Sequence, residues 1–289
     1  MIRMILIKYL FYILLSSLLI GQSQYQILGL ADNALQISSN NGFSGLTDFN
    51  STSNPASLTS GNSQSYSFIY YPSNIKFANF RIMNISVSIL NYGTLEDKLD
   101  NISNNIFSAN EYLLKYNYNK TFKKNLRLGI SIGGYYSQID TYNSYGVIST
   151  LGLNNFFENI NLGIGFTVEN VGFILKNYTN TAVSLPSRYS FNLVYKFKQI
   201  MLGWKLINYL NINNTEYIMS FQFEVYENIF LNLGGSSYRN KLVIHNDYKY
   251  LYGMSCGIGF KVDNIEVNLG IKNLGISGNV FGVTVNNLF

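Results

Sequence analysis

The residues best suited to chemistry in this sequence form a short run near its C-terminal end. Gly253-Met254-Ser255-Cys256-Gly257 matches the G-x-S-x-G pattern, in which an esterase serine sits on a sharp turn between a strand and a helix. Every second residue from Met254 to Phe260 is apolar, however, which predicts a continuous strand instead of that turn. Cys256 is then a small apolar residue on one face of the strand.

Other catalytic and metal-binding groups are scarce. His245 is the only histidine, and its polar neighbours predict a solvated loop. A single histidine excludes multi-histidine metal sites, and a zinc site using Cys256 would lack its usual ligand companions. Glu96, Asp97 and Asp100 form the densest acidic group, which we assign to a solvated loop. We therefore expect no catalysis, no metal and no cofactor, although a carboxylate pair assembled only by folding stays open.

Segments that alternate between apolar and polar residues must position whatever this chain binds. In residues 162–169 the apolar residues Leu162, Ile164, Phe166 and Val168 alternate with small or polar ones, which is the period of a strand with two different faces. The pattern recurs along the chain, in residues 126–133, 189–197, 217–225 and 265–272 among others. We count about fourteen such segments after residue 64. Pro55, Pro72 and Pro186, the only prolines, lie outside them.

The polar face of these segments indicates where the strands reside. It is rich in Gly, Ser, Thr and Asn, and only 12% of all residues are charged, against about 25% in average soluble domains. A soluble sandwich would present a charged face to water, whereas a closed barrel in lipid lines its lumen with small polar groups. We predict an all-β fold, a transmembrane antiparallel β-barrel of about 14 strands over residues 65–289. We expect its few lumenal charges to pair across the interior, among them Arg127, Glu169, Lys196 and Glu224.

Tyrosines cluster near the ends of the alternating segments, as in Tyr135-Tyr136. Such clusters are typical of the aromatic girdles that mark the two lipid interfaces of a barrel. The alternative is the ordinary preference of tyrosine for any sheet.

The N-terminal part divides into two predicted regions. Residues 1–23 read as a secretory signal peptide, with basic Arg3 and Lys8 before an apolar run from Tyr9 to Ile20. That run is shorter than the ~20 residues of a membrane-spanning helix, which disfavours an anchor. Residues 24–64, rich in Ser, Asn and Gly, are predicted to form a plug segment. Loss of the signal leaves a net charge of +3, too mild to indicate nucleic acid.

The sequence ends in an alternating strand that carries a second targeting feature. Phe281, Val283, Val285 and the terminal Phe289 share one face of residues 280–289. This resembles the C-terminal signal by which the barrel-assembly machinery reads outer-membrane proteins. We therefore expect the protein in the outer membrane of a Gram-negative-type bacterium, with outer-membrane lipid and the assembly machinery as partners.

Several short motifs, in order along the chain, carry a family resemblance. They are Tyr25–Asn33 (YQILGLADN), Asn54-Pro55-Ala56, Tyr70–Phe77 (YYPSNIKF), Asn91-Tyr92-Gly93-Thr94, Phe107-Ser108-Ala109, Leu185-Pro186 and Gly253–Phe260. In these stretches the chain resembles the PorV/PorQ family of outer-membrane proteins, which belongs to the wider FadL-like barrels. The Asn-Tyr-Gly-Thr and Phe-Ser-Ala pair is most similar to the PorQ branch.

The resemblance implies a fourteen-stranded barrel with an N-terminal plug that takes part in type IX protein secretion or surface attachment. Such a protein would bind partner proteins of that complex without catalysis. The alternative is a FadL-like transporter of hydrophobic small molecules, because Asn54-Pro55-Ala56 also occurs among those barrels. An outer-membrane enzyme using Ser255 and His245 is the third hypothesis.

Overall fold

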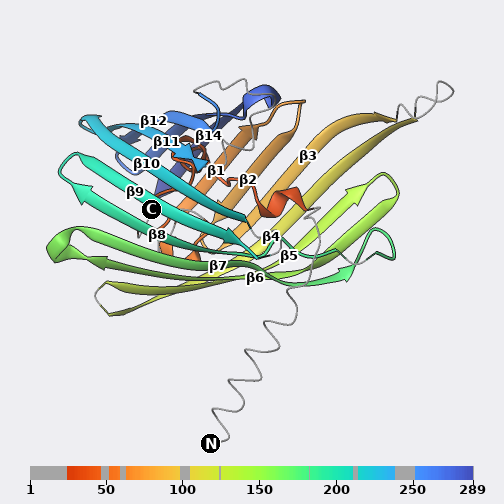
Figure 1. Cartoon of the computed structure of the whole chain (residues 1–289), viewed down its shortest axis with the longest axis horizontal. Coiled ribbons are helices and arrows are strands. Elements are labelled where there is room, and N and C mark those ends of the chain that lie inside the picture. Colours follow the sequence, from red (N-terminus) through yellow and green to blue (C-terminus); the bar gives the residue numbers. More distant parts are fainter. Residues whose placement is uncertain are drawn as a thin grey trace, which may run out of the picture.

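The computed structural model describes residues 25–46, 52–58, 63–97, 105–123, 125–181, 183–210, 214–237 and 251–288. These residues form fourteen antiparallel strands in one closed barrel (Figure 1). Each strand pairs with the next along the chain, and β1 closes the ring against β14. The predicted fold class is confirmed. The predicted signal peptide and Phe289 lie outside the described residues.

The strands differ in length around the ring. They are β1 (Ser63–Tyr70), β2 (Lys76–Ile82), β3 (Ile85–Asp97), β4 (Asn105–Lys123), β5 (Leu126–Ile139), β6 (Tyr142–Phe157), β7 (Leu162–Lys176), β8 (Arg188–Phe197), β9 (Ile200–Tyr209), β10 (Asn214–Tyr226), β11 (Ile229–Ser236), β12 (Met254–Val262), β13 (Ile265–Asn273) and β14 (Asn279–Leu288). A strand needs only ~9–11 residues to cross a membrane, so the longest strands, β4 to β7, extend beyond it.

Helical elements are short and lie between or before the strands. They are η1 (Gln26–Leu28), α2 (Ala34–Ser38), η2 (Pro55–Ser57), η3 (Glu158–Ile160) and η5 (Gly275–Ser277). Among the described residues, no helix is long and apolar enough to span a membrane.

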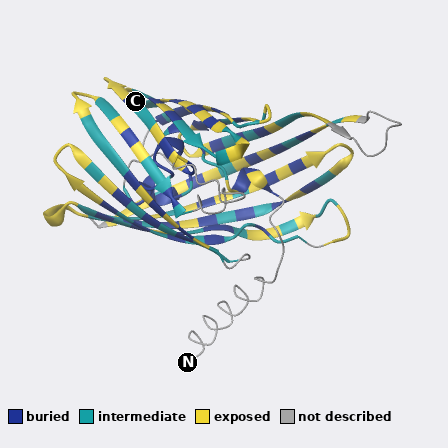
Figure 2. Cartoon of the chain, turned by 45° about the horizontal axis from the view of Figure 1, so that its top comes forward, coloured by how far each residue is buried: buried dark blue, intermediate teal, exposed yellow. Residues whose placement is uncertain are grey.

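Period-2 alternation explains which side chains face inward. In β1, Ser65 and Ser67 are buried, whereas Tyr66 and Phe68 are exposed on the outer surface. Figure 2 shows the same banding of buried and exposed residues along most strands. The outer face is therefore an apolar band suited to lipid, and the lumen receives the small polar residues.

The two ends of the barrel differ in their connections. One end has tight turns, such as residues 83–84 and 198–199, in which Met83 and Lys198 adopt left-handed backbone conformations with φ of 51° and 48°. The other end carries the longer connections 177–187 and 237–253. We call these the short-turn end and the long-loop end. In bacterial barrels short turns face the periplasm and long loops face outside.

Two sequence predictions differ in detail from the structure. The first strand begins at Ser63, two residues before the predicted start of the barrel. Tyr136 lies on the outer face, but Tyr135 is buried in the lumen, so the girdle prediction was wrong for Tyr135. The reason is that consecutive strand residues face opposite sides of a sheet, and a Tyr-Tyr pair cannot place both rings in lipid.

Candidate functional site in the barrel lumen

Residues 25–46 and 52–58 lie inside the ring of strands, and we call them the interior segment. In Figure 1 this segment, coloured red to orange, is surrounded by the wall. Helix α2 packs against β11 to β14, and η2 packs against β4 to β6. The lumen is therefore occupied by the chain itself.

Hydrogen bonds fasten the part of the interior segment that contains α2. The backbone N–H of Ala34 donates to Thr284 Oγ1 at 2.8 Å, and the side-chain amide of Asn40 donates to Ser255 Oγ at 3.0 Å. From the opposite wall, Asn192 Nδ2 donates to the carbonyl of Gly42 at 2.8 Å. Buried backbone groups without a sheet neighbour need such partners. The short polar side chains of the wall supply them.

The motif Asn54-Pro55-Ala56 packs directly on the wall. Asn54 Nδ2 donates to Asn154 Oδ1 at 2.6 Å, and Asn54 Oδ1 caps η2 by accepting from the N–H of Ala56. Gly129 and Gly152 lie beneath the motif: a Cβ on Gly129 would come within 2.3 Å of Ala56 N, and one on Gly152 within 2.1 Å of Asn54 Oδ1. Glycine at these two wall positions allows the motif its close approach.

The first residues of the interior segment make a different kind of contact. Tyr25, Ile27 and Leu28 are buried in an apolar cluster with wall residues that adjoin the long loops. The Tyr25 and Tyr135 ring centroids are 4.8 Å apart, and the hydroxyl groups of Tyr25 and Ser144 are hydrogen-bonded at 2.7 Å. The wall and loop members of this lumenal apolar cluster are Ile69, Phe77, Leu90, Leu113, Tyr135, Ile148, Leu185 and Val280.

Charged side chains stand where the polar and apolar parts of the lumen meet. A cavity of about 20 Å³ there is bordered by Asp32, Lys115, Glu169 and Arg188, and also by apolar residues such as Phe77. This volume is enough for about one water molecule. Arg188 forms an ion pair with Glu169, with 2.7 Å between Nη2 and Oε2, and both side chains are buried. Buried charges need such pairing.

Acidic groups also fasten the interior segment. Glu111 on β4 accepts from the N–H of Ile27 at 2.9 Å and from the Tyr92 hydroxyl at 2.7 Å. Asp32 accepts from the N–H of Thr52 at 2.7 Å, which ties the two described pieces of the segment together. Burial raises the pKa of Asp32, and the bonds from Thr52 and the charges of Lys115 and Arg81 oppose that shift.

The four charged residues that were predicted to pair inside the lumen differ in what they contact. Glu169 is paired inside the lumen, but with Arg188 directly opposite it on the neighbouring strand β8 and not across the interior, and Arg127 donates to the carbonyl of Leu58 at 3.4 Å. Lys196 is exposed and Glu224 is half-buried, and both lie near the short-turn end of their strands, so neither pairs across the interior among the described residues. Sequence reasoning missed Arg81, Glu111, Lys115, Arg188 and Lys205. The available signal was a charged residue on the polar face of an alternating segment, as for Glu111 and Lys115 on one face of β4.

The serine motif is part of a strand. Ser255 lies in β12 and donates its hydroxyl hydrogen to the carbonyl of Ser38 at 2.8 Å, so it fastens α2. Met254 and Cys256 face outward on the same strand, as predicted from the alternation. His245 lies outside the described residues. Within the described ranges, no group of three or more potential metal-ligating side chains occurs.

Phe281, Val283 and Val285 share the exposed outer face of β14. Their reading by an assembly machinery stays a prediction.

Comparison with known proteins agrees with this architecture. No protein-family model matches the sequence, and no curated protein is similar to it in sequence. Among solved structures, the CymD monoaromatic hydrocarbon channel superposes with a TM-score of 0.54 at 9% identity, over 90% of this chain and 98% of CymD. A FadL homologue from Pseudomonas aeruginosa superposes with a TM-score of 0.51 at 9% identity, over 90% of this chain and 99% of that chain.

The shared property at this low identity is the fold. The chain shares its β-barrel fold with these two proteins. The narrower resemblance to the PorV/PorQ family stays a prediction.

Proposed function

We propose that this protein is an outer-membrane conduit for small hydrophobic molecules and that the lumenal apolar cluster is its binding site. The observation that carries the proposal is the position of that cluster. It lies toward the long-loop end of a barrel whose other lumenal residues are mostly Ser, Thr, Asn and charged residues, with a smaller apolar cluster around Phe43 and Val194. A pore for polar solutes has no use for buried aromatic and aliphatic side chains at its long-loop end. The fold similarity to a monoaromatic hydrocarbon channel supports the same function.

The composition of the cluster favours uncharged or weakly amphipathic ligands. Tyr25, Tyr135 and Phe77 offer aromatic surface, and Leu113 and Ile148 offer aliphatic surface. Burying such surface against a ligand contributes roughly 25 cal/mol per Å². The charged cavity beside the cluster already holds the carboxylates of Asp32 and Glu169 next to Lys115, which favours uncharged ligands over fatty acids.

Binding requires displacement of the first residues of the interior segment. The cavity of about 20 Å³ is too small for a hydrocarbon, and Tyr25, Ile27 and Leu28 fill the apolar site. A hydrophobic ligand would take their place, because apolar contacts are not directional and one apolar group substitutes for another.

The test is binding of labelled naphthalene and of labelled fatty acids of graded chain length to the purified protein in detergent. Leu113→Gln places an amide in the apolar cluster and should weaken binding about tenfold or more, since it removes roughly 1.5–3 kcal/mol of apolar burial. Asn117→Gln, on the same face of β4 but outside the cluster, is the matched control and should leave the affinity unchanged. Absence of binding for every ligand, or equal binding by both variants, would contradict the proposal.

A second candidate is the accessory role in type IX secretion or surface attachment that the PorV/PorQ resemblance implies. Two of the resembling motifs, Asn91–Thr94 and Phe107–Ala109, lie side by side, because Thr94 pairs with Ser108 across β3 and β4. Beside this pairing, Gly93 has a φ of +75° and donates its N–H to Asn91 Oδ1 at 2.8 Å, in an irregular stretch of β3. Tyr70–Phe77 forms the neighbouring β1–β2 connection at the same end. These stretches would form a single surface for partner proteins.

A pull-down of the tagged full chain from native outer membranes tests this candidate. Co-purification of secretion or surface-attachment proteins, lost in a variant that carries Gly93→Pro, would support it. Recovery of the barrel without partner proteins, but with hydrophobic ligands bound, would contradict the accessory role and favour transport.

A further inference from the structure

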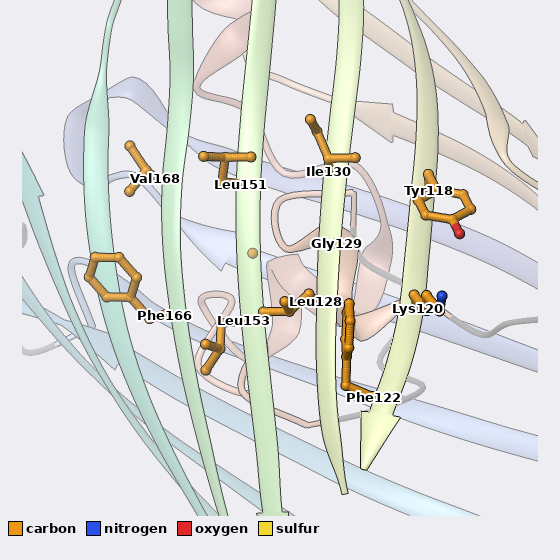
Figure 3. Close-up of a pocket in the computed structure, with 11 residues that line it drawn as sticks. Tyr118, Lys120, Phe122, Leu128, Gly129, Ile130, Leu151, Leu153, Phe166 and Val168 are labelled. Atoms are coloured by element: carbon orange, nitrogen blue, oxygen red, sulfur yellow. The ribbon is translucent and has the colours of Figure 1, made fainter. Parts of the chain in front are cut away.

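A trough runs along the outer, lipid-facing surface of β4 to β7 (Figure 3). Its volume is about 450 Å³. The floor consists of Leu128 and Ile130 on β5 and of Leu151 and Leu153 on β6. Aromatic side chains stand at its sides, Tyr118 and Phe122 on β4 and Phe166 on β7.

Strand register explains the trough. Ile130 is paired with Leu151 and Leu128 with Leu153, so four aliphatic side chains of similar height lie next to one another. Of the four adjoining positions on β4 and β7, two carry larger rings, since Tyr118 pairs with Ile130 and Phe166 with Leu153, and the other two carry Lys120 and Val168. Aliphatic residues between taller aromatic ones leave a depression on the outer surface.

The wall beneath this depression is supported from inside. Gly129 and Gly152, which lie between the floor residues along β5 and β6, contact Asn54, Pro55 and Ala56 of the interior segment. Outward movement of this wall would break its close contact with the hydrogen-bonded motif and leave a void behind it, which close-packed interiors disfavour. The trough is therefore preformed.

Its dimensions match a lipid chain within one leaflet. From Tyr118 to Phe122 the strand advances four residues, or about 13 Å at ~3.3 Å per residue. One leaflet contributes about half of the ~30 Å hydrocarbon thickness. An acyl chain lying along β4 and β5 would thus be covered over most of its leaflet.

Among the described residues that line the trough, one is charged. Lys120 on β4 is exposed, and its Nζ lies 5.6 Å from the centroid of the Phe122 ring, toward the end of the strand at the short-turn end. On the lipid face a lysine is tolerated near the interface, where its ammonium reaches the headgroups. Its charge complements a phosphate there.

We propose that the trough is a binding site for one anionic phospholipid of the periplasmic leaflet. An acyl chain lies over Leu128, Ile130 and Leu151, and the headgroup phosphate binds Lys120. The site is separate from the lumen, so lipid binding there does not depend on the proposed transport function.

The experiment uses a tryptophan at the rim of the trough as a reporter. Trp204 is the only natural tryptophan, so Trp204→Phe combined with Phe166→Trp reports on the trough alone. The folded full-length protein is placed in phosphatidylcholine vesicles that contain increasing fractions of brominated phosphatidylglycerol, which quenches tryptophan on contact. A parallel series uses brominated phosphatidylcholine. Phosphatidylglycerol should quench with about fivefold preference, the ratio that one lysine near an anionic headgroup supplies.

Two lysine variants separate a site from general charge attraction. Lys120→Gln should abolish the preference. Lys198→Gln is the matched control, because Lys198 Nζ lies 5.5 Å from the Phe197 ring at another turn of the short-turn end but does not line the trough. It should leave the preference intact.

Three results would overturn the proposal. They are equal quenching by the two lipids, equal loss of preference in both lysine variants, and a reporter shielded from lipid at all compositions, which would indicate a second copy of the chain on this face. If Phe166→Trp does not fold, as judged by migration on a detergent gel before and after boiling, Val168→Trp serves as the reporter in its place.

Discussion

The two parts of the interior segment are held in the lumen by different forces. From Asn33 to Ala56 the described residues are fastened by hydrogen bonds to wall side chains and by close packing on Gly129 and Gly152. From Tyr25 to Leu28 the side chains pack in the lumenal apolar cluster, which Ile37 of α2 also joins, and hydrogen bonds to Glu111 and Ser144 supplement that packing. Hydrogen bonds and steric fit specify one arrangement, whereas an apolar surface accepts any partner of suitable shape. The difference indicates which part a hydrophobic ligand can displace.

The largest effect is expected where the two parts meet. Arg188→Ala leaves Glu169 buried without its ion-pair partner, which should lower the free energy of unfolding by about 3–5 kcal/mol. Urea titration of the protein in lipid vesicles measures this change. Adding Glu169→Gln should recover most of the loss, because the unpaired charge is gone. A loss under about 1 kcal/mol would show that charge pairing does not hold this boundary.

A smaller effect is expected in the hydrogen-bonded part. Gly129→Ala brings a methyl group against the backbone of Ala56 and should destabilise the barrel by about 1–3 kcal/mol. Gly134→Ala, on the same strand, is the control, since the nearest atom to its added Cβ is 3.9 Å away. Equal unfolding midpoints for the two variants would mean that η2 moves freely on the wall.

The smallest effect is expected in the apolar part. Tyr25→Phe keeps the ring contacts but removes the hydrogen bond to Ser144, so the free energy of unfolding should fall by only about 0.5–1.5 kcal/mol. The matched control, Tyr66→Phe, alters an exposed hydroxyl on the outer face and should change little. If Tyr25→Phe is as damaging as Gly129→Ala, the two parts do not differ as proposed.

Much of the wall could be predicted from the sequence, because a strand's alternation is a local property. The period of residues such as Leu162 to Val168 shows which side chains share a face, and a polar face poor in charge indicates a lumen. The same rule correctly placed Met254 and Cys256 on one outward face and predicted a continuous strand at Ser255. The same rule could also have corrected the girdle prediction for Tyr135, because its neighbour Tyr136 faces the lipid.

The candidate sites could not be predicted in this way, because each depends on strand register or on how the interior segment lies against the wall. Periodicity does not show that Glu111 holds Ile27 or that Arg188 meets Glu169, since both pairings depend on which strands become neighbours and how deep the interior segment lies. The trough depends on the register that sets Leu128 beside Leu153. A shift of a single residue would turn those side chains to the other face.

The sequence by itself thus determined a β-barrel with an apolar exterior and a lumen of small polar groups. The reason is that the alternation of residues along each strand decides which side chains share a face. Only the tertiary structure decided how the interior segment contacts the wall, where the lumenal charges meet and which part of the interior segment is apolar. Those features arise from ring closure and strand register, which bring together groups that no local pattern connects.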